Sequence, residues 1–112
     1  MANKLRVIGG QWRSRILTFT DTPGLRPTPV RIRETLFNWL QYDVVGSRCL
    51  DLFAGSGALG IEALSRGAKS VTQVEKDAGA CQSLRANKAQ LSAQKLQVIE
   101  MDVQQFLKRE NE

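Results

Sequence analysis

The 112-residue sequence contains no histidine, and this absence excludes several kinds of catalytic site. A Ser–His or Cys–His catalytic pair cannot form without an imidazole, and most zinc sites use one as a ligand. The only cysteines, Cys49 and Cys81, lie in apolar stretches without C-x-x-C spacing. This pattern favours free thiols in a reducing compartment over the alternative, a disulfide or a metal site. We therefore expect no metal site.

Long hydrophobic runs are absent as well. No stretch approaches the ~20 apolar residues of a membrane span. The N-terminal sequence MANKLRVIGG has neither the apolar region nor the cleavage site of a signal peptide. The composition, with 42% hydrophobic and 24% charged residues, is typical of one soluble globular domain. We therefore expect a cytoplasmic protein without a membrane partner.

Acidic residues are scarce in the first third of the chain. Residues 1–33 contain seven Lys or Arg and one acid, Asp21, for a net charge of +6, whereas residues 34–112 have a net charge of −1. Clustered arginines with an interleaved aromatic residue, here Trp12, are typical of nucleic-acid contact. The alternative from composition alone is a solvated basic hairpin that has no partner.

The apolar pattern of the first third predicts a β-hairpin followed by a helix. Apolar runs at residues 5–8 and 15–19 flank the segment GGQWR, which would form the hairpin tip. Thr28 followed by Pro29 is a typical helix start, with the Thr28 hydroxyl as N-cap. The helix is expected to reach residue 41. Its predicted buried stripe consists of Ile32, Leu36, Trp39 and Leu40.

From residue 48 onward the sequence predicts alternating strands and helices. Strands are expected at residues 49–53, 70–74 and 96–101, and helices at residues 58–66, 78–91 and from 103 onward. Gly67 is placed to end the first of these helices, and Asp77 is placed to cap the second. This order predicts the α/β fold class: the first half of a doubly wound, Rossmann-like parallel sheet, with an unpaired edge beside its first strand.

The first of these strands ends in a glycine-rich turn. The sequence DLFAGSGALG places Gly55, Gly57 and Gly60 in the spacing G-x-G-x-x-G, and Glu75 follows Gly55 by 20 positions. This is the pattern of a nucleotide-binding turn, in which glycine lets the backbone approach the ligand closely.

Asp51 distinguishes between two ligands for this turn. A dinucleotide places its pyrophosphate at the helix N-terminus, where the Asp51 carboxylate would repel it. S-adenosylmethionine has an ammonium group, a sulfonium and no phosphate, so a carboxylate at the strand end suits it. A dinucleotide-dependent oxidoreductase half-domain is the alternative.

The sequence D-x-F-x-G-x-G-x-x-G resembles the first motif of class I S-adenosylmethionine-dependent methyltransferases. In that family the acid that ends the second strand, here Glu75, holds both ribose hydroxyls. The acid after the third strand, here Asp102, accepts a hydrogen bond from the adenine amino group. The cofactor-binding residues that the resemblance implies are Asp51, Phe53, Ala54, Gly55, Gly57, Glu75, Asp102 and Val103. The alternative is that the three acids are ordinary strand-end or cap residues.

The first third narrows the resemblance. The stretches RVIGGQWRSRIL and GLRPTPVRIRETLFNWL, followed by the methyltransferase core, are similar to the bacterial 16S rRNA guanine-N2 methyltransferases of the RsmD type. The resemblance implies S-adenosylmethionine as cofactor. It also implies 16S rRNA as partner, in the small ribosomal subunit or its assembly intermediate. The RNA-contacting residues that it implies are Arg6, Trp12, Arg13, Arg15, Arg26, Thr28, Arg31 and Arg33.

The sequence lacks the motif that holds the target base in this family. That motif, Asp/Asn-Pro-Pro-aromatic, ends the fourth strand of the core, but prolines occur here only at positions 23, 27 and 29. We therefore assign no catalytic residue. We expect either a truncated product or a chain whose other half is supplied elsewhere; a non-catalytic RNA-binding or degenerate fragment is the alternative. The expected parts are a basic hairpin and loop over residues 1–28 and half of a methyltransferase domain over residues 29–112.

Overall fold

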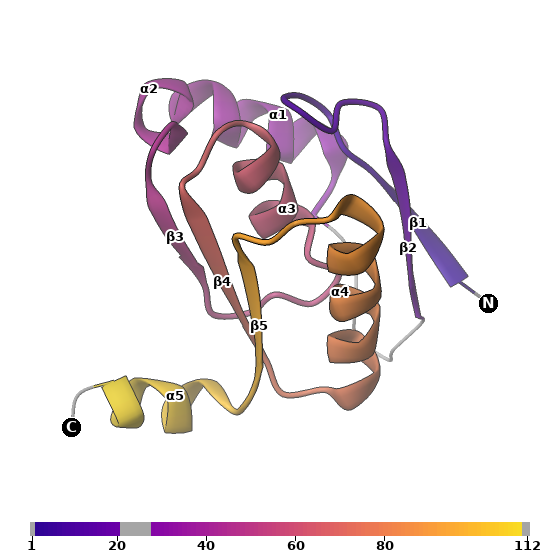
Figure 1. The fold of residues 1–112 in the computed structure, drawn as a ribbon. Coiled ribbons are helices and arrows are strands. Elements are labelled where there is room, and N and C mark those ends of the chain that lie inside the picture. The colour runs from indigo at the N-terminus through magenta and orange to yellow at the C-terminus, as the bar shows by residue number, and fades with distance from the viewer. Residues whose placement is uncertain (1, 21–27, 111–112) are drawn as a thin grey trace.

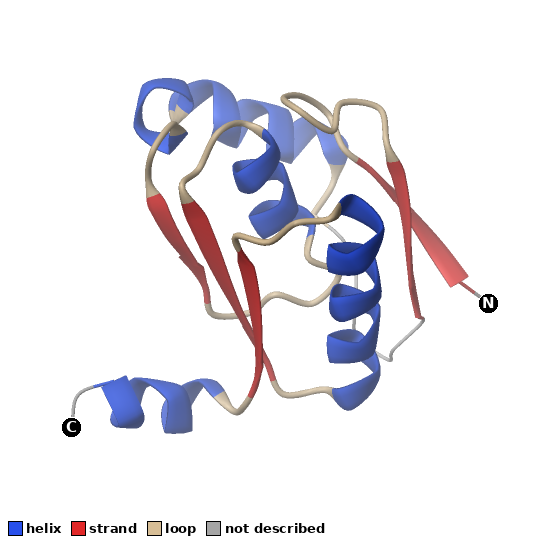
Figure 2. Ribbon diagram, viewed as in Figure 1, coloured by secondary structure: helices blue, strands red, loops and turns tan. Residues whose placement is uncertain are grey.

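The computed structural model describes residues 2–20 and 28–110. A hairpin comes first, two helices follow, and strands then alternate with helices (Figures 1 and 2). The strands are β1 (Ala2–Arg6), β2 (Ile16–Thr20), β3 (Arg48–Asp51), β4 (Ser70–Glu75) and β5 (Leu96–Glu100). The helices are α1 (Val30–Trp39), α2 (Gln41–Val44), α3 (Ala58–Ser65), α4 (Ala78–Leu91) and α5 (Val103–Glu110).

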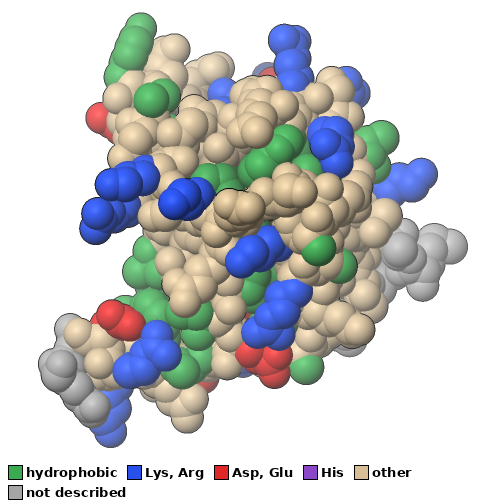
Figure 3. Space-filling view, viewed as in Figure 1, with side chains coloured by type: hydrophobic (Ala, Val, Ile, Leu, Met, Phe, Trp, Pro, Cys, Tyr) green, Lys and Arg blue, Asp and Glu red, His purple; other side chains and the backbone are tan. Residues whose placement is uncertain are grey.

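The strands form two separate sheets. β1 and β2 make an antiparallel hairpin, and the other three strands make a parallel sheet in the order β3-β4-β5. This confirms the predicted first half of a doubly wound, Rossmann-like fold. β3 lies at the edge of the sheet, and within the described residues no strand pairs with its outer side. Leu50 and Phe53 are exposed there, and Figure 3 shows hydrophobic side chains gathered beside α5.

Helix α3 lies between the parallel sheet and the N-terminal elements (Figure 1). It packs on β3 and β4, and one apolar core joins it to the hairpin. Helix α4 packs on β5 and also on β2. The Asn87 side chain of α4 donates a hydrogen bond to the Thr18 carbonyl at 2.9 Å. Two helices of the α/β part therefore hold the hairpin, and the domain boundary after residue 28 stays a prediction.

Two glycines of the motif, Gly57 at the N-cap of α3 and Gly60 within the helix, are required by packing. Gly57 has a φ of +84°, and a Cβ added there would lie 2.6 Å from a methyl carbon of Leu84. A Cβ added at Gly60 would collide with the buried side-chain amide of Gln73 in β4. These two glycines therefore let α3 approach β4 and α4 closely, which is one of the uses of this motif.

The helix ends of the α/β part are those that the sequence predicts. The Asp77 carboxylate accepts a hydrogen bond from the Ala80 backbone N–H at 2.8 Å and caps α4. Gly67 follows the last turn of α3 with a φ of +106°. Both cysteines are free thiols, with Cys81 buried and Cys49 half-buried.

The predicted buried stripe of α1 is half right: Leu36 and Leu40 are partly buried and pack against the core. Ile32 and Trp39 are exposed, and the fully buried positions of the helix are Arg33 and Phe37. The helix is turned this way because Arg33 pairs with a buried carboxylate on α3, while Arg66 lies over the Phe37 ring. Its start also differs from the prediction: Pro29 occupies the N-cap position, and no side chain caps the first turn.

Candidate functional site

The turn between β3 and α3 is fastened to the end of β4 by Glu75. One carboxylate oxygen of Glu75 accepts from the Gly55 backbone N–H at 3.0 Å, and the other accepts from the Asp77 N–H at 2.8 Å. The Ala54 N–H also donates to the Val74 carbonyl at 3.2 Å. Each carboxylate oxygen can accept two hydrogen bonds. Glu75 thus orders the turn and keeps acceptor capacity for a ligand.

Asp51 and Glu75 lie at the same edge of the sheet. The parallel register pairs Asp51 with Gln73, and Glu75 with Glu100. Burial raises the pKa of the Asp51 carboxyl, the Phe53 N–H that bonds to it lowers the pKa, and the nearby negative charge of Glu75 raises it. Among the residues that the structure describes, neither acid pairs with a Lys or Arg. A cationic ligand would relieve the repulsion between them.

Asp102 follows β5 at the same edge. Its side chain accepts from the Gln104 N–H at 2.8 Å, and its carbonyl accepts from the Phe106 N–H at 3.0 Å, so it caps α5. The Met101 N–H donates to the Glu75 carbonyl at 2.9 Å and ties this segment to β4. The Asp102 side chain and the Phe53 ring are exposed. The three strand-end acids and the glycine turn therefore meet at one edge of the sheet.

The basic side chains of the hairpin border an open cavity of about 320 Å³ beside the start of α1. Its lining residues are Arg6, Ile8, Arg13, Ser14, Val30 and Glu34. Arg15 and Arg31 are also exposed, and the face drawn in Figure 3 carries several projecting Lys and Arg side chains. The structure thus brings Arg6 and Arg13 together, whereas Arg26 lies outside the described residues.

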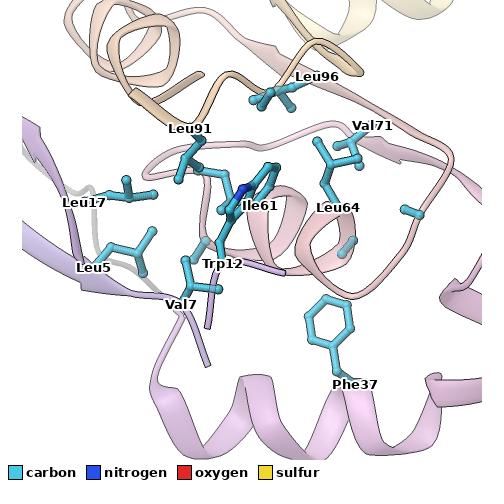
Figure 4. Packing of buried hydrophobic residues seen from close by; sticks show 14 of the residues in the cluster. Leu5, Val7, Trp12, Leu17, Phe37, Ile61, Leu64, Val71, Leu91 and Leu96 are labelled. Atoms are coloured by element: carbon cyan, nitrogen blue, oxygen red, sulfur yellow. The ribbon is translucent and has the colours of Figure 1, made fainter. Parts of the chain in front are cut away.

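Two of the predicted RNA-contacting side chains are in the protein interior. Trp12 is 8% exposed, and Figure 4 shows it among Leu17, Ile61, Leu64 and Leu91. The Arg33 guanidinium donates to the Glu62 carboxylate and to the carbonyls of Arg6 and Thr28. We therefore remove both residues from the candidate RNA-contacting surface, because a buried side chain cannot reach an external polyanion.

Comparison with known proteins shows the family of the chain. A family model described as Conserved hypothetical protein 95 matches residues 5–112. The chain belongs to this family. Over 106 residues it is 52% identical to the ribosomal RNA small subunit methyltransferase D of Escherichia coli strain K12, covering 95% of this chain and 54% of that protein. The methyltransferase D of Haemophilus influenzae is 47% identical over 108 residues, covering 95% and 56%.

A solved structure has the same fold. It is described as a putative methyltransferase from Escherichia coli, with 48% identity and a TM-score of 0.88. The match covers 94% of this chain and 56% of that one. The fold is accordingly the first half of a Rossmann-like class I methyltransferase. The chain spans about half the length of the curated relatives that it matches.

The sequence analysis does not single out Glu62, a buried acid that links α3 to α1 and to the segment after β1. Glu62 lies in α3, two residues after Gly60, and is 0% exposed. Its signal in the sequence was a single acid in the otherwise apolar segment ALGIEALS, with Arg66 four residues later.

Within the described residues there is no group of three or more acids and cysteines that could hold a metal ion. No described helix is both long and apolar enough to cross a bilayer.

Proposed function

We propose that this chain binds S-adenosylmethionine at the carboxyl edge of β3, β4 and β5 and contacts 16S rRNA with its hairpin. Both contacts would serve the transfer of a methyl group from S-adenosylmethionine to the exocyclic N2 amine of a guanine in that RNA. The observation that carries the proposal is the meeting of Asp51, Glu75 and Asp102 around the glycine turn, with no Lys or Arg pairing with Asp51 or Glu75 among the described residues. Membership of a family that includes ribosomal RNA small subunit methyltransferases supports the RNA substrate.

The donor set fits this cofactor better than a dinucleotide. Asp51 would hold the ammonium group, Glu75 the ribose hydroxyls and Asp102 the adenine amine, while Phe53, Ala54, Gly55, Gly57 and Val103 would line the site. The cofactor supplies an electrophilic methyl group on a sulfonium. The Asp51 carboxylate, at the end of β3 beside the glycine turn, would instead repel a pyrophosphate. Calorimetric titration with S-adenosylhomocysteine and with NADH tests this choice, and we expect binding of the first only.

The proposed reaction needs positioning more than acid–base catalysis. A guanine amine has to be brought into line with the methyl group, and alignment of this kind can lower a barrier by several kcal/mol, roughly 7–11 in well-oriented systems. The base also has to leave its stack to reach the site. A protein without histidine can perform both tasks. We propose the cytoplasm as the place of this activity, because its RNA substrate is assembled there.

Replacing Glu75 by Ala should weaken binding of S-adenosylhomocysteine by about 1.5–3 kcal/mol, the usual contribution of a hydrogen bond to a charged group. The matched control is Glu100→Ala, because Glu100 ends the neighbouring strand in register with Glu75 and its ion pair among the described residues is with the exposed Arg85. Its affinity should equal that of the parent. Unchanged calorimetric affinity in the Glu75 variant would sink the cofactor assignment.

Replacing Arg13 and Arg15 together by Ala should weaken RNA binding and flatten its salt dependence. Each lost phosphate contact lowers the slope of log affinity against log salt by about 0.7–0.9. Lys108→Ala with Arg109→Ala is the control, because it removes the same charge from α5, which lies far from the hairpin loop in Figure 1. If both double variants gave the parent's slope in filter-binding titrations, the hairpin would be merely solvated.

A further inference from the structure

The carboxylate of Glu62 joins three elements of the fold. One oxygen accepts from the Ile8 backbone N–H at 3.0 Å and from Arg33 of α1 at 3.3 Å. The other accepts from the Gly9 N–H at 2.9 Å and from Arg66 of α3 at 2.7 Å. Four donors fill the acceptor capacity of a carboxylate. The segment that follows β1 is therefore bonded directly to α3.

Arg33 extends this network to the residues beside the cavity. Its guanidinium donates to the Arg6 carbonyl at 3.1 Å and to the Thr28 carbonyl at 3.2 Å. Burial lowers the pKa of Arg33, and the negative charge of Glu62 acts in the opposite direction. The pair thus holds the backbone of Arg6, whose side chain lines the cavity, and the chain that enters α1.

A second contact locks the hairpin loop to the same helix. The Ser65 hydroxyl accepts from the Trp12 N–H at 2.9 Å and donates to the Gly9 carbonyl at 2.6 Å. The Gln11 N–H donates to the Ser65 carbonyl at 2.7 Å. Gly10, with a φ of +80°, is the only residue type that fits here, because a Cβ would collide with that carbonyl. These hydrogen bonds and the close approach at Gly10 therefore hold the hairpin loop in a fixed position against the C-terminal end of α3.

Stability alone is a poor reason for this buried network. Removing charges from water is costly, and replacing a buried ion pair by apolar residues of similar size is often neutral or stabilising. The network instead lies between α3 and the hairpin, where it can fix the orientation of one relative to the other. Glu62 is four residues, or roughly 6 Å of helix, from the glycine turn at the start of α3. The same rigid helix thus contacts the cofactor turn at one end and the hairpin further along.

We infer that Glu62 and Arg33 are positioning residues that hold the RNA-contacting face of the hairpin in a set orientation relative to the cofactor turn. This inference rests on the proposed function and adds to it the means by which the RNA and cofactor sites are aligned. Neither side chain touches RNA or cofactor. Their removal acts through the backbone of residues 6–9, which donates to Glu62 or accepts from Arg33.

The test compares Glu62→Gln with the double variant Arg33→Met, Glu62→Gln. The single variant leaves Arg33 buried without its partner and should lose stability. The double variant removes the two fully buried charges. Arg66 also loses its partner, but its side chain is 22% exposed and can reach solvent, so stability should return toward the parent's. In the double variant, binding of 16S rRNA should still be about tenfold weaker, while affinity for S-adenosylhomocysteine should change by less than about twofold.

Asn87→Ala is the matched control, because it breaks the bond from α4 to the Thr18 carbonyl but leaves Glu62 intact. It should lower stability without changing RNA affinity. Amide hydrogen exchange gives a readout that needs no RNA: the Ile8 and Gly9 amides should exchange faster in both Glu62 variants. The Gly55 amide, which is held by Glu75, should not.

Three outcomes are distinguishable. Weaker RNA binding by a folded, cofactor-binding double variant supports the inference. RNA binding equal to the parent's in that variant overturns the inference and leaves the proposed function standing, since a purely structural role recovers with stability. A parent chain that binds no 16S rRNA overturns the proposed function, and the inference with it.

Discussion

Replacing Trp12 by Ala should destabilise the fold by about 3–5 kcal/mol, the usual cost of truncating a buried tryptophan. The side chain fills the space between the hairpin, α3 and α4, where Leu17, Ile61 and Leu91 surround it (Figure 4). Small domains are stable by only about 5–15 kcal/mol. The variant should therefore unfold at a much lower urea concentration, as measured by far-ultraviolet circular dichroism, or show no cooperative transition.

Trp39→Ala is the control for the same change in side chain. Trp39 is 76% exposed at the end of α1, so its removal should alter stability by no more than about 0.5 kcal/mol. In that variant Trp12 is the remaining tryptophan, so the fluorescence emission comes from its buried indole. The emission maximum should shift to longer wavelength when unfolding exposes the indole to water. The opposite pattern, with Trp12→Ala stable but weak in RNA binding, would show that Trp12 belongs to the RNA-contacting surface after all.

The α/β part of the fold could be predicted from sequence because local and long-range preferences agree there. A strand of apolar residues, a glycine turn and a capped helix follow one another, and each has its own signal in the chain. Asp77 caps α4 and Gly67 ends α3 as predicted. The parallel register then places every strand end at one edge. The positions of Asp51, Glu75 and Asp102 follow from this topology without knowledge of any side-chain contact.

Burial in the first third of the chain cannot be predicted from local sequence, because it depends on contacts with residues that are distant in sequence. Periodicity assigns arginine to the surface and isoleucine to the core, but Arg33 is buried and Ile32 is exposed. The reason is Glu62, 29 residues further along the chain, because its buried carboxylate forms an ion pair with the Arg33 guanidinium. The arginines that surround Trp12 in the sequence predict an exposed side chain, but Trp12 is buried. Its backbone N–H is bound by Ser65, which turns the loop toward α3.

The chain of 112 residues, assayed by itself, should transfer no methyl group above background. By family resemblance, the residues that hold the target amine belong to an Asp/Asn-Pro-Pro-aromatic motif, and this sequence contains no Pro-Pro. Contacts of that kind act mainly in the transition state, so their absence removes rate even where RNA and cofactor still bind. The proposed cofactor site uses acids, and the proposed RNA surface uses basic side chains, but we assign none of the described residues to the acceptor amine.

Three parallel measurements make this prediction decisive. Tritiated S-adenosylmethionine is incubated with undermethylated small ribosomal subunits and the chain, while calorimetry with S-adenosylhomocysteine verifies that the chain is folded and binds its cofactor. The Escherichia coli relative, which is about twice as long, serves as the positive control. The same sequence extended through an Asp/Asn-Pro-Pro-aromatic motif should become active. The added residues would hold the target guanine in line with the methyl group of the cofactor. Incorporation at guanine N2 by the unextended chain would instead place the acceptor site within these 112 residues. The exposed edge of β3 and the strand-end acids beside it would then be the first place to look for it.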